Sequence, residues 1–181
     1  MPTLNTEPKI APKAAAKTLA KTVAMRPQQA DRSAGKPDAI ALLRSDHEAV
    51  HRLFLAYEKA RSTPRRKALV AEICHLLSVH AQIEEEIFYP EVKAALKDKL
   101  LVPEARVEHA GIKTLIDELL GADVDDEPYD AKVKVLSEYV AHHVKEEQDE
   151  MFPKAKASSL DMAELGARLA ARQQALLAQQ A

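Results

Sequence analysis

The sequence contains few of the residues that build disulfide frameworks or interrupt helices. Among 181 residues there are four glycines, no tryptophan and one cysteine, Cys74. A single cysteine forms no disulfide within the chain, so nothing supports an exported, disulfide-bonded scaffold. No apolar run approaches the length of about 18 residues that a membrane span requires, and the N-terminal region lacks the apolar core and cleavage site of a signal peptide. We therefore predict a cytoplasmic protein without a membrane span.

Helix-forming residues are abundant instead, and charge divides the chain into two parts. Ala, Leu, Lys and Glu are frequent, which favours an all-α fold. Residues 1–37 carry seven Lys or Arg against two acidic residues, a balance of +5, and the total of −2 leaves −7 for the remainder. This composition predicts a flexible basic tail in front of an acidic folded domain. The spacing of Lys13, Lys17 and Lys21 leaves open a basic helix that binds an anionic partner weakly, nucleic acid included.

From residue 38 onward, inward-facing residues recur at intervals of three and four, which is the spacing of one helix face. Four such stripes follow one another along the chain. Their members are Ile40, Leu43, His47, Val50, Phe54 and Tyr57; then Leu69, Ile73, Leu76, His80, Ile83, Glu84 and Ile87; then Ala105, His109, Ile112, Ile116 and Leu119; and finally Val133, Leu136, Val140, His143, Glu147 and Met151.

Prolines indicate where these helices begin and end. Pro64 suits the first turn of the second helix. Pro90 is expected to interrupt or kink that helix, with residues 92–100 helical beyond it. The third helix is expected to begin near Pro103, and the fourth to stop before Pro153.

Four amphipathic helices with short connections predict an up-down-up-down four-helix bundle. The expected domain boundaries are a basic tail at 1–37, the bundle at 38–155, and a C-terminal segment at 156–181. The last segment is rich in Ala and Gln, and we expect it to form one extra helix over about 160–180.

Each stripe contains one histidine, and two stripes also contain a glutamate. A single histidine on an apolar face is usually a core residue with a hydrogen-bond partner. Burying four imidazoles and two carboxylates without partners costs about 1–3 kcal/mol for each group, and a bound metal offsets that cost. The sequence therefore predicts a metal site made by His47, His80, Glu84, His109, His143 and Glu147.

The two halves of the domain repeat this arrangement. His80 and Glu84 lie one helical turn apart, as do His143 and Glu147, and a proline follows each glutamate by six residues. The unpaired histidine precedes the paired one by 33 residues in the first half and by 34 in the second. The domain is therefore interpreted as two helix hairpins related by a rough two-fold axis.

The strings DHEAVHRLF, HAQIEEEIFYP, EHAGIKTL and HHVKEEQDEMFP, in this order, resemble the hemerythrin-like HHE cation-binding family. The resemblance runs from about Ile40 to Pro153 and covers neither the basic tail nor the C-terminal helix. It implies a four-helix bundle around a non-haem diiron centre. In that centre the four histidines would be terminal ligands, and Glu84 and Glu147 would bridge the ions.

The resemblance also implies how the ions are shared. His47 and His80 would hold one iron and His109 and His143 the other, with an oxo or hydroxo bridge between them. Each iron would keep an open position for oxygen, nitric oxide or peroxide. Mixed imidazole and carboxylate ligands suit iron or manganese, whereas the lack of thiolates argues against iron–sulfur or structural zinc.

Several further residues are weighed against this set. His51 lies one turn after His47 and is a candidate fifth imidazole, but Lys113 occupies its equivalent in the second half. His75 and His142 fall off the ligand faces, and Cys74 is expected to serve packing. We expect four acids to orient imidazoles or lie in solvent: Glu85, Glu86, Glu146 and Glu150.

The sequence departs from the oxygen-carrying hemerythrins, which use His-x-x-x-His in the third helix and His-x-x-x-x-Asp in the fourth. The corresponding strings here are His109-x-x-x-Lys113 and His143-x-x-x-Glu147. The set is closer to bacterial hemerythrin-like proteins linked to nitric oxide handling, iron–sulfur cluster repair and peroxide removal. We expect a diiron protein that binds or senses oxygen, nitric oxide or peroxide. The alternatives are an enzyme that removes peroxide or supports cluster repair, and an iron store or donor without turnover. The oligomeric state stays open.

Overall fold

A computed structural model describes residues 38–179, and over this range the chain is all-α with no strand, as the sequence predicts. None of the helices in this range is both long and apolar enough to span a bilayer. The basic segment 1–37, for which a flexible tail is predicted, lies outside the described residues. The elements are α1 (Ala39–Lys59), α2 (Thr63–Ile83), the π-helical turn η1 (Glu84–Phe88), α3 (Tyr89–Ala95), α4 (Leu101–Leu120), α5 (Tyr129–Glu146), the π-helical turn η2 (Glu147–Met151), α6 (Phe152–Lys156) and α7 (Met162–Gln179).

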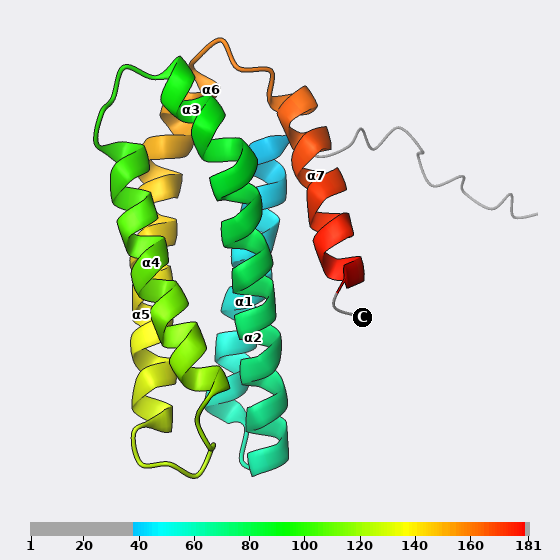
Figure 1. Cartoon of the computed structure of the whole chain (residues 1–181), viewed down its shortest axis with the longest axis vertical. Helices are drawn as coiled ribbons and strands as arrows, with labels where there is room; N and C mark the ends of the chain where they lie inside the picture. Colours follow the sequence, from blue (N-terminus) through cyan, green and yellow to red (C-terminus); the bar gives the residue numbers. More distant parts are fainter. Residues whose placement is uncertain (1–37, 180–181) are drawn as a thin grey trace, which may run out of the picture. The chain divides into compact units, whose positions relative to one another are not determined.

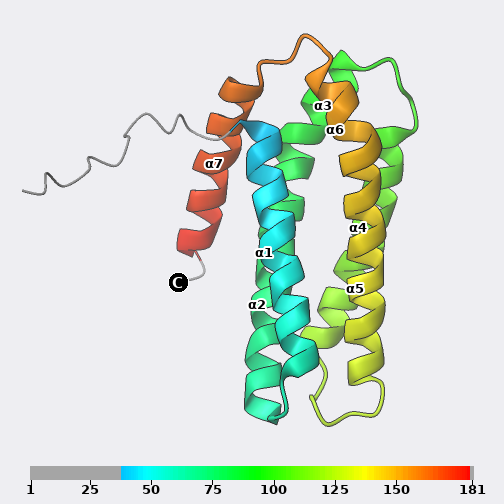
Figure 2. The ribbon, with the colours of Figure 1, turned by 180° about the vertical axis from the view of Figure 1, so that it is seen from behind.

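The four long helices α1, α2, α4 and α5 lie side by side (Figure 1). The colour order shows that each of them runs opposite to the one before it in the chain. The reverse view shows α7 along the outside of the bundle, next to α1 (Figure 2). The C-terminal helix that the Ala/Gln-rich segment predicts is therefore present as α7.

Pro90 interrupts the regular helix and the chain stays helical beyond it, as the sequence predicts, whereas the fourth helix does not stop before Pro153, contrary to expectation. At each of them the helix widens into a π-helical turn and then continues as α3 or α6. In these turns the amide N–H of Tyr89 bonds to the carbonyl of Glu84, and that of Phe152 to the carbonyl of Glu147. A proline has no N–H and its ring crowds the preceding turn, so a wider turn accommodates it without breaking the helix. Both turns begin at the predicted glutamates.

The helical stretch expected over 92–100 is shorter than predicted, because α3 ends at Ala95. Leu96 adopts an extended backbone conformation. The Asp98 carboxylate then accepts hydrogen bonds from the backbone N–H groups of Leu100 and Leu101, at 2.9 and 3.3 Å. These bonds satisfy donors at the start of α4, so Asp98 separates the two helices.

A polar layer lies between two apolar clusters within the bundle. One cluster surrounds α3, α6 and α7 and includes Phe88, Phe152 and Leu169. The other fills the opposite end and includes Ile73 and Leu136. The buried polar side chains between the clusters are His47, His80, Glu84, His109, His143 and Glu147. The fold therefore gathers the predicted polar residues in one interior layer.

Candidate metal centre

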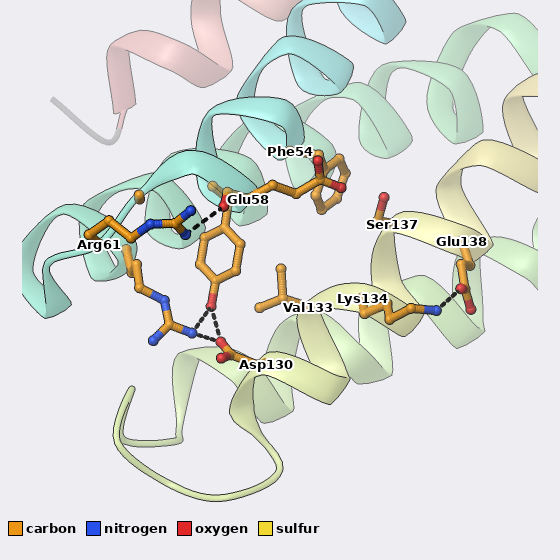
Figure 3. Close-up of a pocket in the computed structure, with 11 residues that line it drawn as sticks. Phe54, Glu58, Arg61, Asp130, Val133, Lys134, Ser137 and Glu138 are labelled. Atoms are coloured by element: carbon orange, nitrogen blue, oxygen red, sulfur yellow. Dashed lines mark hydrogen bonds and ion pairs between the residues drawn. The ribbon is translucent and has the colours of Figure 1, made fainter.

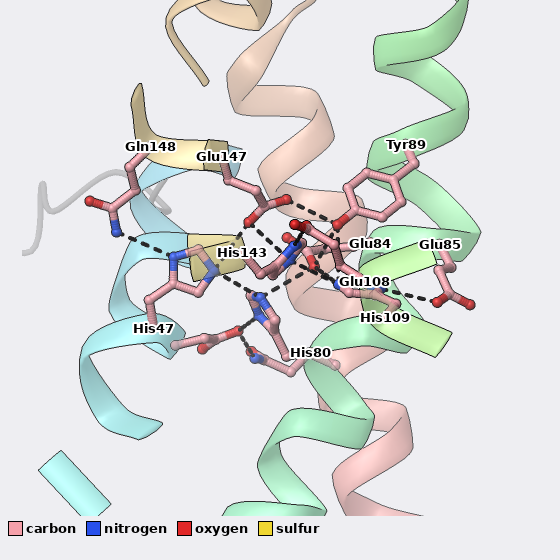
Figure 4. A network of polar contacts seen from close by, with 12 residues as sticks. His47, His80, Glu84, Glu85, Tyr89, Glu108, His109, His143, Glu147 and Gln148 are labelled. Atoms are coloured by element: carbon pink, nitrogen blue, oxygen red, sulfur yellow. Dashed lines mark hydrogen bonds and ion pairs between the residues drawn. The ribbon is translucent and has the colours of Figure 1, made fainter. Parts of the chain in front are cut away.

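The six predicted residues come from the four long helices and the two π-helical turns, and they meet in the core (Figure 4). His47 lies on α1, His80 near the end of α2, His109 on α4 and His143 on α5. No side chain of the set is more than 7% exposed. Burial of six polar groups in one layer requires strong compensation, as the sequence argument anticipates.

The imidazoles form two pairs. The Nε2 atoms of His47 and His80 are 2.9 Å apart, and those of His109 and His143 are 3.0 Å apart. Two ligands bound at right angles to one ion, each at about 2.1 Å, lie about 3 Å from each other. Both pairs therefore have the separation that a shared metal ion imposes.

Each buried carboxylate faces one imidazole of each pair. Glu84 Oε2 lies 3.3 Å from His80 Nε2 and 3.4 Å from His109 Nε2. Glu147 Oε2 lies 3.3 Å from the Nε2 atom of His47 and 3.7 Å from that of His143. The donors accordingly form two overlapping groups whose ligand atoms lie within 4.8 Å of one another: His47, His80, Glu84 and Glu147; and Glu84, His109 and His143.

A polar side chain lies beside the outer nitrogen, Nδ1, of every imidazole. The Nδ1 of His80 is 3.3 Å from Asp46, and that of His143 is 2.7 Å from Glu108. The Nδ1 of His109 is 3.0 Å from Glu85, and that of His47 is 3.4 Å from the Gln148 amide. An imidazole that donates its Nδ1–H to a carboxylate presents a lone pair at Nε2, which is the ligating form.

These outer partners follow the internal repeat. Asp46 and Glu108 directly precede the unpaired histidines, whereas Glu85 and Gln148 directly follow the two glutamates. Glu85 is one of the acids that the sequence predicts to orient imidazoles, whereas Asp46, Glu108 and Gln148 are not predicted. The signal for Asp46 and Glu108 was present, since an acid occupies the same repeat position in both halves.

The residues fit a bound cation. In the His109/His143 pair both Nδ1 atoms face carboxylates, so the two Nε2 atoms direct lone pairs at each other across 3.0 Å, which is repulsive unless a cation lies between them. In addition, Glu84 Oε1 and Glu147 Oε2 are buried and have no hydrogen-bond partner among residues 38–179. Two orphaned carboxylate oxygens beside four inward-facing nitrogens are the donor set of a metal site.

Burial separates the pKa values of the two glutamates in the metal-free protein. Burial raises the pKa of Glu84 well above its ordinary value, and the neighbouring Glu147 carboxylate adds to the rise. Burial also acts to raise the pKa of Glu147, but the adjacent imidazoles of His47 and His143 outweigh it and lower that pKa to about 2. The pair therefore carries a proton on Glu84 that a cation must displace.

The pKa values of the imidazoles also shift in opposite directions. Burial lowers the pKa of His47, and burial together with the charge of His143 lowers the pKa of His109 to about 4. For His143 burial acts in the same downward direction, but the hydrogen bond to Glu108 outweighs it and raises the pKa. Two of the imidazoles are therefore already in the neutral, ligating form at neutral pH.

Tyr89 is a seventh polar residue at the centre, and the sequence argument does not identify it. Its side chain is fully buried, and its hydroxyl donates a hydrogen bond of 3.0 Å to Glu147 Oε1. The Tyr89 hydroxyl oxygen also lies 3.4 Å from Glu84 Oε2 and 3.2 Å from His109 Nε2. Burial and the two nearby carboxylates raise the pKa of Tyr89 well above its usual value, so it stays a hydrogen-bond donor. The repeat position in the second half holds Phe152, which stacks on His47 with 5.9 Å between ring centroids.

The remaining candidates lie away from the layer. His51 is exposed at the bundle surface, and His75 is half-buried. His142 is exposed and lies near the carboxylates of Glu108 and Glu146, at 3.4 and 3.2 Å. Cys74 packs in the core, where burial raises the pKa of its thiol to about 11.

An internal cavity, and an open groove along the seam between α1 and α5, adjoin the centre. An internal cavity of about 20 Å³ borders all four histidines, and its other walls are mainly apolar, among them Val50, Leu77 and Ile112. An open groove of about 360 Å³ reaches the outer side of His47 and shares Val140 and Val144 with that cavity. A larger cavity, about 570 Å³, lies farther along the same seam, away from the six residues (Figure 3).

A family model described as the hemerythrin HHE cation-binding domain matches residues 38–155. The chain belongs to this family. The resemblance seen in the sequence is thereby confirmed. The cation-binding description and the two buried His/Glu groups together support a metal site in this HHE domain.

Two relatives extend the comparison. A crystal structure of an HHE cation-binding domain-containing protein from Mycobacterium kansasii matches with a TM-score of 0.70, covering 79% of this chain and 89% of the other at 23% identity. At that identity the likeness shows the fold. A DNA nickase from Nostoc sp. is 24% identical over 111 residues, which are 61% of this chain and 31% of the nickase. The HHE chain thus spans less than a third of that relative's length.

Proposed function

We propose that this HHE protein is a non-haem diiron protein that binds or senses a small ligand: oxygen, nitric oxide or peroxide. The observation that carries the proposal is the arrangement of the four imidazoles in two pairs, whose Nε2 atoms are 2.9 and 3.0 Å apart. Each of the two carboxylates faces one imidazole of each pair. One iron would be held by His47 and His80 and the other by His109 and His143. Glu84 and Glu147 would be shared. Imidazole and carboxylate donors suit iron, and the described residues place no thiolate in the layer.

The chain's own residues prepare the site for this role. When bound, two iron ions supply redox-active positions at which a small molecule coordinates. Asp46, Glu85 and Glu108 fix the orientation and tautomer of three imidazoles through Nδ1. Tyr89 orients Glu147 by donating to Oε1. The two apolar clusters on either side of the layer limit access of water.

The internal cavity favours ligand binding over turnover. In the metal-free protein it measures only about 20 Å³, so the space beside the histidines admits small molecules alone. Apart from the histidines, Asp46 is the one ionisable residue in its wall. Peroxide chemistry needs a group that moves protons, and such a wall offers few. We propose that the ligand arrives through the α1/α5 groove, past Val140 and Val144.

The test is metal analysis and an optical spectrum of the purified protein, followed by separate additions of nitric oxide and peroxide. We expect two irons per chain and a spectral change with nitric oxide that reverses when the gas is removed. The metal-free protein is the control. Rapid release of oxygen from peroxide would favour the enzyme alternative, and a protein that takes up no iron would refute the proposal.

Replacing Tyr89 by Phe is expected to lower iron affinity about tenfold while both ions still bind, because Glu147 loses the donor that orients it. Anaerobic titration with Fe(II) measures this. Tyr139→Phe is the matched control, since Tyr139 is half exposed on the surface. Complete loss of one iron would instead make the phenol a ligand, and unchanged affinity would reduce its role to packing.

Replacing His51 by Ala is expected to leave both irons in place. His51 is exposed, lies on the wall of the α1/α5 groove, and has Lys113 as its equivalent in the second half. Iron content per chain, compared with that of His80→Ala, measures the effect. If His51→Ala lost one iron, His51 would be a fifth imidazole ligand.

A further inference from the structure

Helix α7 lies outside the four-helix bundle, yet it is tied to the first half of the domain. Its buried residues Leu165 and Leu169 join the apolar cluster around α3 and α6. Three of its polar side chains reach the segment 39–95. These contacts are Arg168 with Glu91 at 2.6 Å, Arg172 with Glu86 at 2.6 and 3.0 Å, and Gln173 with Asp46 at 2.7 Å.

Gln173 is connected to the metal centre through Asp46. Its side-chain N–H donates to Oδ2 of Asp46, and the same Oδ2 lies 3.3 Å from Nδ1 of His80. An open groove of about 470 Å³ between α1 and α7 has both Asp46 and Gln173 in its wall. Without Gln173, the Asp46 carboxylate is free to rotate into that groove and be solvated there, away from His80.

The other outer carboxylates are held from within the bundle. Lys113 binds both oxygens of Glu85 at 2.7 Å, and Glu85 faces His109. Glu108, the repeat equivalent of Asp46, lies 3.4 Å from the exposed His142 and faces His143. Both belong to the His109/His143 pair. The His47/His80 pair therefore differs in depending on a helix that the repeat does not supply.

We propose that Gln173 is a positioning residue for the ion held by His47 and His80, so that docking of α7 sets the affinity of one ion and not of the other. This inference rests on the proposed diiron function. The helix holds Asp46, Asp46 holds the tautomer and orientation of His80, and His80 presents its Nε2 lone pair to the ion. The two ions are accordingly inequivalent in a domain whose ligands are nearly symmetric.

The size of the effect follows from the distance to the ion. Loss of a group that hydrogen-bonds a ligand costs about 10–100-fold in metal affinity. Gln173 is one hydrogen bond farther from the ion than Asp46, so we expect its loss to weaken the iron affinity of one binding step about tenfold. The second step should change less than about twofold, because Glu108 and Glu85 keep their own partners.

The experiment is an anaerobic Fe(II) titration of the full-length protein that resolves the two binding steps. Gln173→Leu and Gln173→Asn both remove the contact with Asp46. Leucine has no N–H to donate, and the side chain of asparagine is too short to reach the carboxylate. Gln174→Leu is the matched control, since Gln174 is the exposed neighbour in the same groove. Each Gln173 variant is then combined with Asp46→Ala and, separately, with Glu108→Ala. The melting temperature of every metal-free variant is recorded.

We expect Gln173→Leu and Gln173→Asn to weaken one step about tenfold, with the melting temperature of the metal-free protein unchanged. In combination with Asp46→Ala the effects should be far less than additive, whereas with Glu108→Ala they should add. Equal weakening of both steps, additivity with Asp46→Ala, or the same effect from Gln174→Leu would overturn the inference while leaving the diiron function intact. If the unaltered protein fails to bind two irons, the proposed function falls and this inference falls with it.

Discussion

Glu84→Gln is expected to abolish binding of both metal ions and to leave the metal-free protein at least as stable as the unaltered one. Glu84 Oε2 faces His80 and His109, one imidazole from each pair, so both ions lose a ligand in this variant. The loss in affinity should exceed the 10–100-fold or so that removal of an outer partner costs. Burial and Glu147 raise the pKa of Glu84, so its carboxyl is already neutral without metal and an amide replaces it with little change in charge.

Iron content and the melting temperature of the metal-free form measure the two halves of this expectation. Glu150→Gln is the control, because Glu150 is exposed and its ion pair is with Lys154 on the surface. Full iron content in Glu84→Gln would remove this residue from the ligand set. A large fall in the stability of the metal-free variant would show that the carboxylate has a structural role.

Lowering the pH from 7 to 5 is expected to release the metal. In the metal-free protein Glu84 holds a proton because burial raises its pKa, and the bond to Glu108 raises the pKa of His143 despite its burial. Metal binding displaces these protons, so each one makes the apparent affinity fall about tenfold per pH unit. Two released protons give about a hundredfold loss per unit, and calorimetric titration in buffers of different ionisation enthalpy counts them.

The sign of the stability change follows from the same groups. Bound metal depresses the pKa values of the histidines and glutamates, so its stabilisation is present above their unfolded values and is lost as the pH falls through the depressed ones. In the metal-free protein Glu84 acts oppositely. Its raised pKa contributes stability that is present below 4.5 and is lost as the pH rises through the raised value. Melting curves of both forms should therefore converge toward acid pH, and a constant gap between pH 7 and 5 would contradict this.

Periodicity was sufficient to place the four histidines and both glutamates in one layer, because α1, α2, α4 and α5 are regular up to the glutamates. It failed immediately after them. A regular helix places Ile87 on the inward face one turn after Glu84, but the π-helical turn adds a residue and rotates the chain. Ile87 is half-buried as a result, and Phe88 and Tyr89 are buried instead. The hydroxyl that contacts both carboxylates was therefore missed.

The partners of the imidazoles were less accessible to sequence reasoning. Asp46 lies beside His47 in the chain but contacts His80 on another helix, and Glu85 contacts His109 across the bundle. Such pairings depend on how the helices are rotated against one another, which no spacing along one helix specifies. The same is true of Gln173, because the amphipathic pattern of α7 shows that it packs but not on which helices.

The central claim is that each imidazole pair holds one iron. The most direct measurement is a crystal structure of the iron-loaded protein with anomalous diffraction data collected at the iron edge. We predict two anomalous peaks per chain, one bounded by His47 and His80 and one by His109 and His143, with Glu84 and Glu147 reaching both. A single peak, or no peak between the imidazole pairs in crystals soaked with Fe(II), would contradict it.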